Sequence, residues 1–154
     1  MKVSELMTRI VASCRMDDSL TMAAQTMWER DCGAVPVVDA ESKVVAMITD
    51  RDICMAAYTQ GKRLDESTVA TAASRGVVVV HEDETIDHAE ALMRKHQVRR
   101  LPVVTRDRRL VGMLSLNDLA RHLHRWSYQS DGLSSDGIAH TLASISRSSP
   151  AGLG

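Results

Sequence analysis

The chain has 154 residues, of which 44% are hydrophobic and 25% are charged, and its formal net charge is −1. This composition is typical of a folded globular protein, and the near-zero charge argues against nucleic-acid binding as the main function. The apolar runs are too short to cross a bilayer and no signal-peptide pattern follows Met1, so we expect a cytoplasmic protein. Three cysteines, an odd number, indicate reduced thiols rather than disulfides.

The most informative feature of the sequence is an internal repeat with a spacing of 66 residues. A shift by that distance aligns Pro36-Val37-Val38 with Pro102-Val103-Val104, Met47 with Met113 and Asp52 with Asp118, without a gap. Self-similarity at a fixed period indicates a duplicated structural unit. Each copy is too small to bury a stable core alone, so we expect the two copies to pack against each other.

The first copy shows a clear order of predicted elements. A short extended segment at about 10–14 leads to Asp18-Ser19, residue types that cap helices. The helical spacing of Leu20, Ala23 and Met27 then predicts an amphipathic helix that ends near Gly33. Two short strands, 35–38 and 44–48, flank a turn, and residues 51–58 are predicted to form a closing helix. The unit is therefore β-α-β-β-α.

The second copy repeats this order, with an extended segment at 76–80, a helix that begins near Ile86 and a closing helix at 117–124. A short apolar turn at 69–73 corresponds to residues 3–7. We expect an α/β (α+β) fold in which two β-α-β-β-α repeats pack through their sheets as one pseudo-two-fold module. The predicted domains are residues 1–60 and 69–125, joined by a polar linker at 61–68.

The remaining residues, 126–154, form a tail rich in Ser and Gly. Asp136 is a candidate cap for a short helix at 137–146, in which Ile138, Leu142 and Ile145 would lie on one face. Such a helix would dock on a partner subunit. The alternative is a tail without fixed structure, because Ser and Gly dominate its flanks.

The strongest candidate for a binding site lies where the third strand of each copy meets the last helix. The first copy has Thr49-Asp50-Arg51-Asp52 and the second has Ser115-Leu116-Asn117-Asp118, so both contain [ST]-x-x-D. At a helix start, a hydroxyl and a carboxylate at this spacing can hold a ribose diol between them, while the helix N-terminus favours a nearby phosphate. The alternative is that both pairs only cap their helices, since this pattern is common at N-termini.

These segments resemble two consecutive CBS domains, the family named after cystathionine beta-synthase, arranged as a Bateman module. The resemblance covers residues 1–124 and is carried by Val3 to Thr8, Gly33 to Asp39, Met47 to Asp52, Val98 to Val104 and Val111 to Ser115. It implies a cleft on each side of the pair that commonly binds AMP, ADP, ATP or S-adenosylmethionine. It also implies that modules dimerise into flat discs.

The resemblance assigns candidate ligand contacts to this sequence. Asp52 and Asp118 would bind ribose, with Thr49 and Ser115 near the ribose or phosphate. The base would be held by backbone and apolar side chains around Val78, Val79, Leu101 and Pro102, or around Ala12, Ser13, Val35 and Pro36. Arginine suits phosphate because its planar fork binds two oxygens, and Arg51, Arg99 and Arg100 occupy positions where relatives often place basic residues.

The two copies depart from the family pattern in different ways. Ala46 stands where the second copy has Gly112, and a missing glycine can block close approach of a ligand to the backbone. Asn117 replaces a basic residue in the second copy. On the first of these grounds we favour Asp118 over Asp52 as the occupied ribose site.

The sequence gives less support to a basic binding patch, a metal site or a nucleophilic cysteine. The segment from Arg94 to Arg109 contains seven Lys or Arg residues and one acidic residue, Asp107. This basic segment is either a solvated face or a phosphate-facing patch. The histidines lack metal-ligand spacing, so we predict no metal site and no required cofactor. Cys14, Cys32 and Cys54 carry no nucleophile signature, which favours packing roles.

The sequence therefore predicts a stand-alone regulatory homodimer without enzymatic activity. It would bind an adenine-type nucleotide in the inter-domain cleft and signal to a partner protein. The alternative is an interaction or scaffold module that binds no nucleotide.

Overall fold

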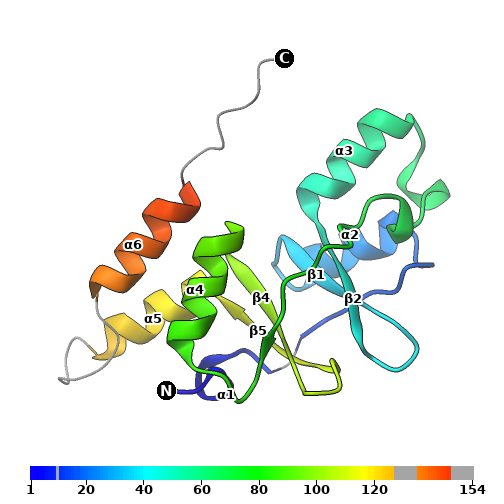
Figure 1. The fold of residues 1–154 in the computed structure, drawn as a ribbon. Helices are drawn as coiled ribbons and strands as arrows, with labels where there is room; N and C mark the ends of the chain where they lie inside the picture. Colours follow the sequence, from blue (N-terminus) through cyan, green and yellow to red (C-terminus); the bar gives the residue numbers. More distant parts are fainter. Residues whose placement is uncertain (10, 127–134, 147–154) are drawn as a thin grey trace. The chain divides into compact units, whose positions relative to one another are not determined.

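The computed structural model describes residues 1–9, 11–126 and 135–146 and forms two compact units (Figure 1). Within the described residues, unit 1 comprises 1–9, 78–103 and the chain from 112 onward, and unit 2 comprises 11–77 and 104–111. Each repeat therefore contributes its first short helical turn to the unit formed mainly by the other repeat: α1 (Val3–Leu6) lies in unit 1, and the 3-10 turn η2 (Val69–Thr71) lies in unit 2. The division at residues 60 and 69 follows the sequence repeat and remains a prediction.

Unit 2 contains α2 (Leu20–Glu29), β1 (Ala34–Val38), β2 (Val44–Thr49), α3 (Asp50–Gln60) and a second 3-10 turn, η1 (Leu64–Glu66). The strands β1 and β2 pair antiparallel, with Ala34 opposite Thr49 and Pro36 opposite Met47. This register brings the end of β2, where α3 begins, beside the start of β1. The predicted helices and strand pair are thus confirmed, apart from the C-terminal end of the first helix.

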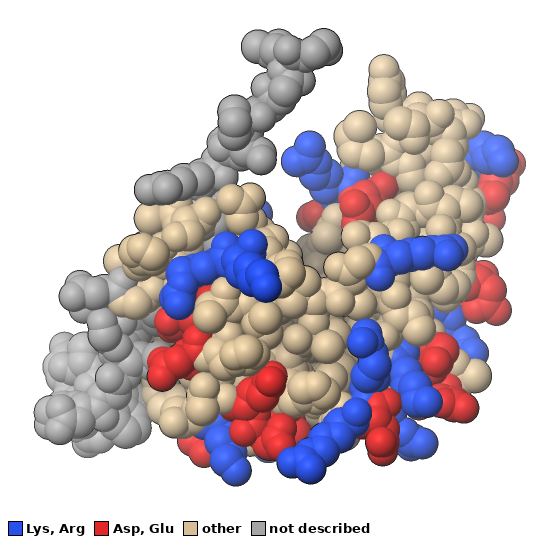
Figure 2. All heavy atoms as spheres, viewed as in Figure 1, with Lys and Arg blue, Asp and Glu red and all other residues tan. Residues whose placement is uncertain are grey.

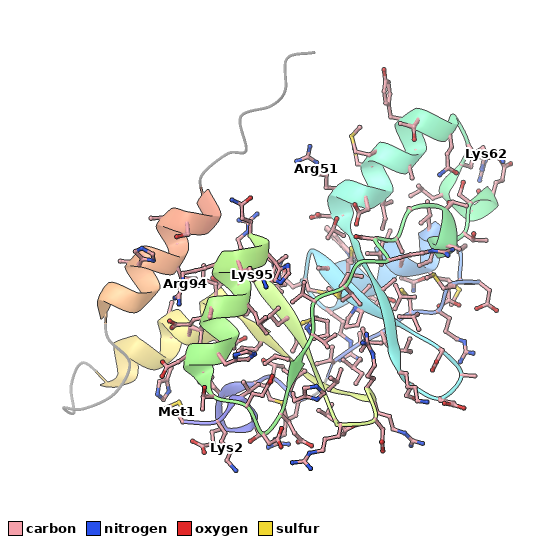
Figure 3. All side chains as sticks on the ribbon, in the orientation of Figure 1. Met1, Lys2, Arg51, Lys62, Arg94 and Lys95 are labelled. Atoms are coloured by element: carbon pink, nitrogen blue, oxygen red, sulfur yellow. The ribbon has the colours of Figure 1, made fainter. Side chains whose placement is uncertain are left out.

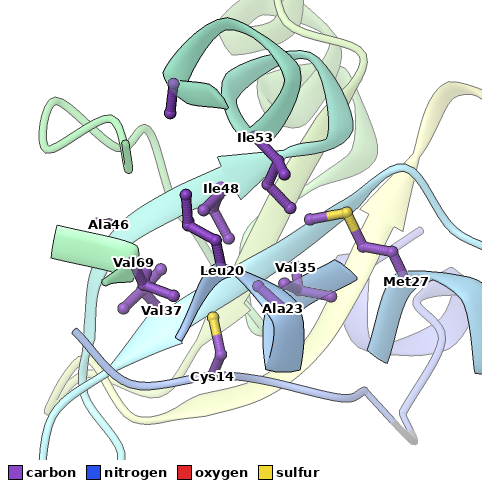
Figure 4. Close-up of a cluster of buried hydrophobic side chains, with 11 residues drawn as sticks. Cys14, Leu20, Ala23, Met27, Val35, Val37, Ala46, Ile48, Ile53 and Val69 are labelled. Carbon is purple, nitrogen blue, oxygen red and sulfur yellow. The ribbon is translucent and has the colours of Figure 1, made fainter. Parts of the chain in front are cut away.

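The core of unit 2 is a cluster of apolar side chains from α2, β1, β2 and α3 (Figure 4). All five residues of β1 are buried, whereas β2 alternates between buried and half-buried positions, because its second face is only partly covered. Leu20 and Ala23 of α2 are fully buried against Val37 and Ile48. The apolar stripe predicted from the helical spacing is therefore the stripe that enters the core.

Unit 1 contains α1, β3 (Val80–His81), α4 (Ile86–His96), most of β4 (Arg100–Val104) and β5 (Leu110–Ser115), α5 (Leu116–Trp126) and α6 (Ser135–Ser146). Its strands form one sheet in the order β3-β4-β5. The N-terminal segment is held on this unit by backbone bonds from Val3 to Glu84, at 2.9 Å, and between Thr8 and Met113, at 2.9 Å in both directions.

Equivalent backbone geometry in the two repeats supports a true duplication. Four described non-glycine residues have positive φ: Asp31 (49°), Ser42 (62°), Gln97 (54°) and Arg108 (64°). They form two pairs 66 residues apart, one just after the first long helix of each repeat and one in the turn between the strands. Because a positive φ is costly for such residues, the same turn must be imposed twice by the surrounding fold.

The bounds of three predicted elements were wrong. The helix expected to end near Gly33 ends at Glu29, and the left-handed residue that follows it is Asp31 rather than a glycine. The strands expected at 10–14 and 76–80 are shorter: only Cys14 pairs with Val37, and the second is the two-residue β3, since the neighbouring backbone has no continuous strand partner. Residue 10 lies outside the described residues.

The tail contains a helix, but it starts earlier than predicted. Because α6 begins at Ser135, Asp136 lies in the first turn and does not precede the helix as a cap. The helix contacts α4 and α5 of its own chain rather than requiring a partner subunit (Figure 1). Thr141 is fully buried, whereas Leu142 is 45% exposed, so the docking side differs from the predicted apolar face. The side chains of Ile138 and Ile145 lie outside the described residues.

A polar contact joins α6 to α4 (Figure 3). Arg94 Nη1 donates to Thr141 Oγ1 at 3.0 Å and lies 3.4 Å from Glu90 Oε2, and Thr141 in turn donates to the Gly137 carbonyl at 2.8 Å. A Cβ on Gly137 would lie 3.3 Å from Glu90 Oε2, which is a tight contact, so α6 and α4 approach closely at this glycine. Burial raises the pKa of the Glu90 carboxyl, while Arg94 opposes that rise.

We expect Thr141→Val to loosen α6 without unfolding the rest of the chain. The substitution keeps the side-chain volume but leaves Arg94 without this acceptor, which is worth about 1 kcal/mol. Hydrogen–deuterium exchange of the α6 amides should therefore become about fivefold faster. Ser144→Ala is the matched control, because Ser144 donates only to the His140 carbonyl within α6. Equal protection in both variants would contradict a role for this contact.

Candidate functional site

In unit 2, Thr49 and Asp52 meet at the start of α3. Thr49 Oγ1 accepts a hydrogen bond from the Asp52 backbone N–H at 3.1 Å, and Asp52 Oδ2 accepts one from the Thr49 N–H at 2.9 Å. Both residues are half-buried. The predicted juxtaposition of hydroxyl and carboxylate is therefore present, in the form of a reciprocal capping box. Within the described part of the chain, Asp52 Oδ1 accepts no hydrogen bond, so this oxygen can still receive a ligand hydroxyl.

In unit 1, Ser115 and Asp118 form the equivalent pair at the start of α5. Asp118 Oδ2 accepts from the Ser115 N–H at 2.8 Å and from Ser115 Oγ at 2.6 Å, and Ser115 Oγ accepts from the Asp118 N–H at 3.2 Å. The other carboxylate oxygen, Oδ1, forms an ion pair with Arg121, one turn further along the helix. Asp118 is 7% exposed, and both of its oxygens are engaged.

The two aspartates differ in the acceptor capacity that remains, and this difference favours Asp52, whereas the sequence favoured Asp118. Asp52 retains an oxygen that accepts no hydrogen bond and is half-buried, whereas Asp118 is buried and its Oδ1 is already paired with Arg121. The part played by Arg121 was missed in the sequence. An acid and a base three residues apart on a helix are the signal that would have revealed it.

The preference for Asp118 rested on Gly112, and the structure gives this glycine another role. A Cβ at Gly112 would lie 2.6 Å from Met7 Sδ and 2.9 Å from the Thr8 carbonyl oxygen, so the glycine makes room for the N-terminal segment of its own chain. In the first repeat, Ala46 and Ala73 occupy the positions equivalent to Gly112 and Met7. Two small side chains therefore replace a glycine and a large side chain. These contacts supply a packing reason for the difference between Gly112 and Ala46.

The residues proposed to hold the base differ in accessibility. Val35 and Leu101 are 1% and 0% exposed, and Pro36 and Pro102 are also buried, so these four could offer a ligand little beyond their backbone. Val78 and Val79 are half-buried and have accessible side-chain surface. Four of the eight proposed base contacts lie in unit 2 with Thr49 and Asp52, namely Ala12, Ser13, Val35 and Pro36. The other four, Val78, Val79, Leu101 and Pro102, lie in unit 1 with Ser115 and Asp118.

The basic candidates are exposed, and the run from Arg94 to Arg109 is divided between the two units. Arg51, Arg99 and Arg100 are all exposed, and Arg51 extends outward from α3 (Figure 3). Residues 106–109 belong to unit 2, whereas residues 94–100 belong to unit 1, where Arg94 is engaged with Glu90 and Thr141. On the face drawn in Figure 2, basic and acidic side chains are interspersed. This distribution favours an ordinary solvated surface with a few local phosphate candidates.

Cysteine and metal chemistry receive no support from the described residues. Burial, with a smaller effect of nearby Asp18, raises the pKa of the Cys14 thiol to about 12, so this thiol stays protonated and is a poor nucleophile. No group of three or more His, Cys, Asp or Glu side chains in the described ranges could hold a metal ion. Among the helices of the same ranges, none combines the length and apolar character that a bilayer crossing requires.

Comparisons of the sequence identify known relatives. The CBS domain profile matches residues 3–58 and 69–125. Hypoxic response protein 1 of Mycobacterium tuberculosis is 37% identical over 106 residues, which cover 69% of this chain and 73% of that protein. The CBS domain-containing protein YhcV of Bacillus subtilis is 34% identical over 138 residues, which cover 90% of this chain and 95% of that protein.

Solved structures of similar fold include ligand complexes. The CBS domain pair of protein MJ0100, in complex with 5′-methylthioadenosine and S-adenosyl-L-methionine, matches with a TM-score of 0.73 and 27% identity over 81% of this chain and 97% of that one. Hypoxic Response Protein I, with two coordinated zinc ions, matches with a TM-score of 0.72 and 33% identity over 79% of this chain and 98% of that one. Both likenesses confirm the expected α+β architecture of two repeats.

Proposed function

Since the chain belongs to the CBS domain family and carries two copies in tandem, we propose that it is a regulatory module that binds an adenosine-containing ligand and signals to a partner protein. The ligand class includes AMP, ADP, ATP and S-adenosylmethionine. The module would act in the cytoplasm and perform no turnover. Its two repeats would be residues 1–60 and 69–125, joined by the linker 61–68.

One observation carries the proposal: the hydroxyl and carboxylate of [ST]-x-x-D converge at a strand-to-helix corner in both repeats. A carboxylate accepts hydrogen bonds from two adjacent sugar hydroxyls, which few other surface groups can do from one side chain. The complex of the MJ0100 CBS domain pair, a relative at 27% identity, contains two adenosine compounds and supports the same ligand class here.

The first repeat is the better ribose site in this proposal. Asp52 would use Oδ1 for the diol while Oδ2 keeps its bond to the Thr49 N–H. Arg51 is exposed in the same first helical turn, and the helix N-terminus carries a positive partial charge. These two features together favour a ligand that bears phosphate next to its ribose, such as AMP, ADP or ATP.

Titration calorimetry of the purified full chain with AMP, ADP, ATP, S-adenosylmethionine and 5′-methylthioadenosine tests the proposal. We expect saturable binding of at least one compound and a melting temperature that rises with its concentration. The 2′-deoxy analogue of the best ligand is the matched control. It should bind about tenfold to a hundredfold more weakly, because it lacks one hydroxyl of the diol. Equal affinity for the two sugars would contradict a carboxylate–diol contact.

The competing function is an interaction module that binds no nucleotide. Both capping boxes are complete without a ligand, which is the observation that favours it. Absence of heat and of any thermal shift with all five compounds at millimolar concentration would establish this alternative. Release of a product from a bound compound, followed by chromatography, would instead indicate an enzyme.

A further inference from the structure

A poorly satisfied carboxyl group lies under α6 in unit 1. Glu90 on α4 is 5% exposed, and its Oε1 accepts no hydrogen bond within the described part of the chain. Its other oxygen, Oε2, lies 3.4 Å from Arg94 Nη1, which is too long for a strong charged hydrogen bond. Buried polar atoms usually have partners, because an ionised acceptor without one is costly away from water. The ionised form of Glu90 is therefore unfavourable in this position.

The helix α6 covers this carboxyl group. An added Cβ at Gly137 would lie 3.3 Å from Glu90 Oε2, so the α6 backbone passes close to the carboxyl oxygen. Arg94 Nη1 donates to Thr141 Oγ1 at 3.0 Å, and Thr141 is fully buried. Figure 1 shows α6 beside α4 along this contact. Release of α6 would therefore return Glu90 to water.

The first repeat supports this role of α6. At a distance of 66 residues, Glu90 and Arg94 correspond to Ala24 and Trp28. Ala24 is half-buried and Trp28 is 87% exposed, and the described part of unit 2 contains no helix equivalent to α6. The acid and the base at these positions thus occur only in the repeat whose helices carry α6.

Protonation of Glu90 changes the free energy with which α6 docks. Burial raises the pKa of the Glu90 carboxyl above its ordinary value of 4.5, while Arg94 opposes the rise and Asp87 adds to it. Release of α6 would return this pKa towards 4.5. The stabilisation of the docked state by protonation is therefore fully present below pH 4.5 and is lost as the pH rises through the raised value. Acid should hold α6 on α4, and neutral pH should loosen it.

Other titratable groups near this contact can be separated from Glu90. The charged groups that act on Glu90 are Asp87 and Arg94 on its own helix. The neighbouring elements contribute His81 on β3, Asp118, Arg121 and His122 on α5, and His140 on α6. The side chain of Asp136 lies outside the described residues. Because all of these groups remain when Glu90 is replaced, a substitution at Glu90 distinguishes its effect from theirs.

We propose that Glu90 is a proton-controlled latch for α6: its neutral carboxyl keeps the helix docked on α4, and its carboxylate favours release. Release would uncover Glu90, Arg94 and the side of α4 that α6 covers, so the accessible surface of the second repeat would change with pH. The latch does not involve a nucleotide, so this proposal and the proposed function can fail independently.

Hydrogen–deuterium exchange of the full chain between about pH 4 and about pH 7, corrected for the intrinsic pH dependence of exchange, tests the latch. In the wild type, the α6 amides should exchange about fivefold faster or more at the higher pH, while the α4 amides change little. Glu90→Gln places a neutral group of similar shape under α6 and should abolish this difference. Glu29→Gln is the matched control and should behave as the wild type, because Glu29 is an exposed carboxylate on α2 that accepts from Gln25.

Three results would overturn the proposal. A pH dependence that persists in Glu90→Gln would assign the effect to another group. Protection of α6 in the wild type that does not fall as the pH rises would exclude the latch. A change shared equally by α4 and α6 would indicate unfolding of the whole unit. If Glu90→Gln does not fold, Glu90→Ala decides by the same criteria, since alanine occupies the equivalent position of the first repeat.

Discussion

Gly112→Ala is expected to lower the free energy of unfolding by about 1–3 kcal/mol, which is the usual range for overpacking a filled site. The added Cβ would lie 2.6 Å from Met7 Sδ and 2.9 Å from the Thr8 carbonyl oxygen. The thioether can rotate away, but the carbonyl belongs to a backbone pair between Thr8 and Met113 that has bonds of 2.9 Å in both directions. Urea denaturation followed by circular dichroism measures the loss.

A double-mutant cycle separates the two contributions. Met7→Ala in the Gly112→Ala background recreates the Ala46 and Ala73 combination of the first repeat, so we expect the two substitutions together to cost less than the sum of their separate effects. Ala46→Gly is the reciprocal control. It should destabilise by about 1 kcal/mol, because it removes a buried methyl group and adds backbone freedom in a strand. Strict additivity in the cycle would show that Met7 and Gly112 are not coupled.

The parts of the fold that depend on local chemistry could be predicted from the sequence. Ser19 was expected to cap the first long helix of the first repeat, and its hydroxyl accepts a hydrogen bond from the backbone N–H three residues on, at 3.2 Å. Thr85, at the equivalent position of the second repeat, accepts the same bond at 3.3 Å. The helix ends could not be predicted in the same way. Asp31 and Gln97 adopt left-handed conformations that a pattern based on glycine does not anticipate, because tertiary contacts impose the turn.

In the candidate site, too, local contacts could be predicted from the sequence, whereas burial and long-range contacts could not. The spacing of three residues was sufficient to predict that Thr49 meets Asp52 and that Ser115 meets Asp118. Burial was not predictable from spacing, and it leaves Val35 and Leu101 little beyond their backbone to offer a base. The packing role of Gly112 could not be predicted either, because its neighbour Met7 is far away in the sequence and no local pattern indicates such a contact.

Asp52→Asn is expected to weaken binding of the adenosine ligand by about 1.5–3 kcal/mol, the value of a hydrogen bond to a charged group. The asparagine carbonyl can still accept from the Thr49 N–H, so α3 keeps most of its cap, but the amide nitrogen cannot accept a sugar hydroxyl. Calorimetry should therefore show an affinity lowered about tenfold to a hundredfold, with a melting temperature close to that of the wild type.

Asp118→Asn should produce the opposite pattern. Asp118 is buried and engages Ser115 and Arg121, so its replacement should lower the melting temperature more than Asp52→Asn does, while ligand affinity changes less. Asp50→Asn is the matched control, because Asp50 lies in the same helical turn as Asp52 but is exposed and accepts only from the Arg51 N–H. If Asp118→Asn abolished binding and Asp52→Asn did not, the ribose would lie at the second repeat, beside the ion pair of Asp118 and Arg121.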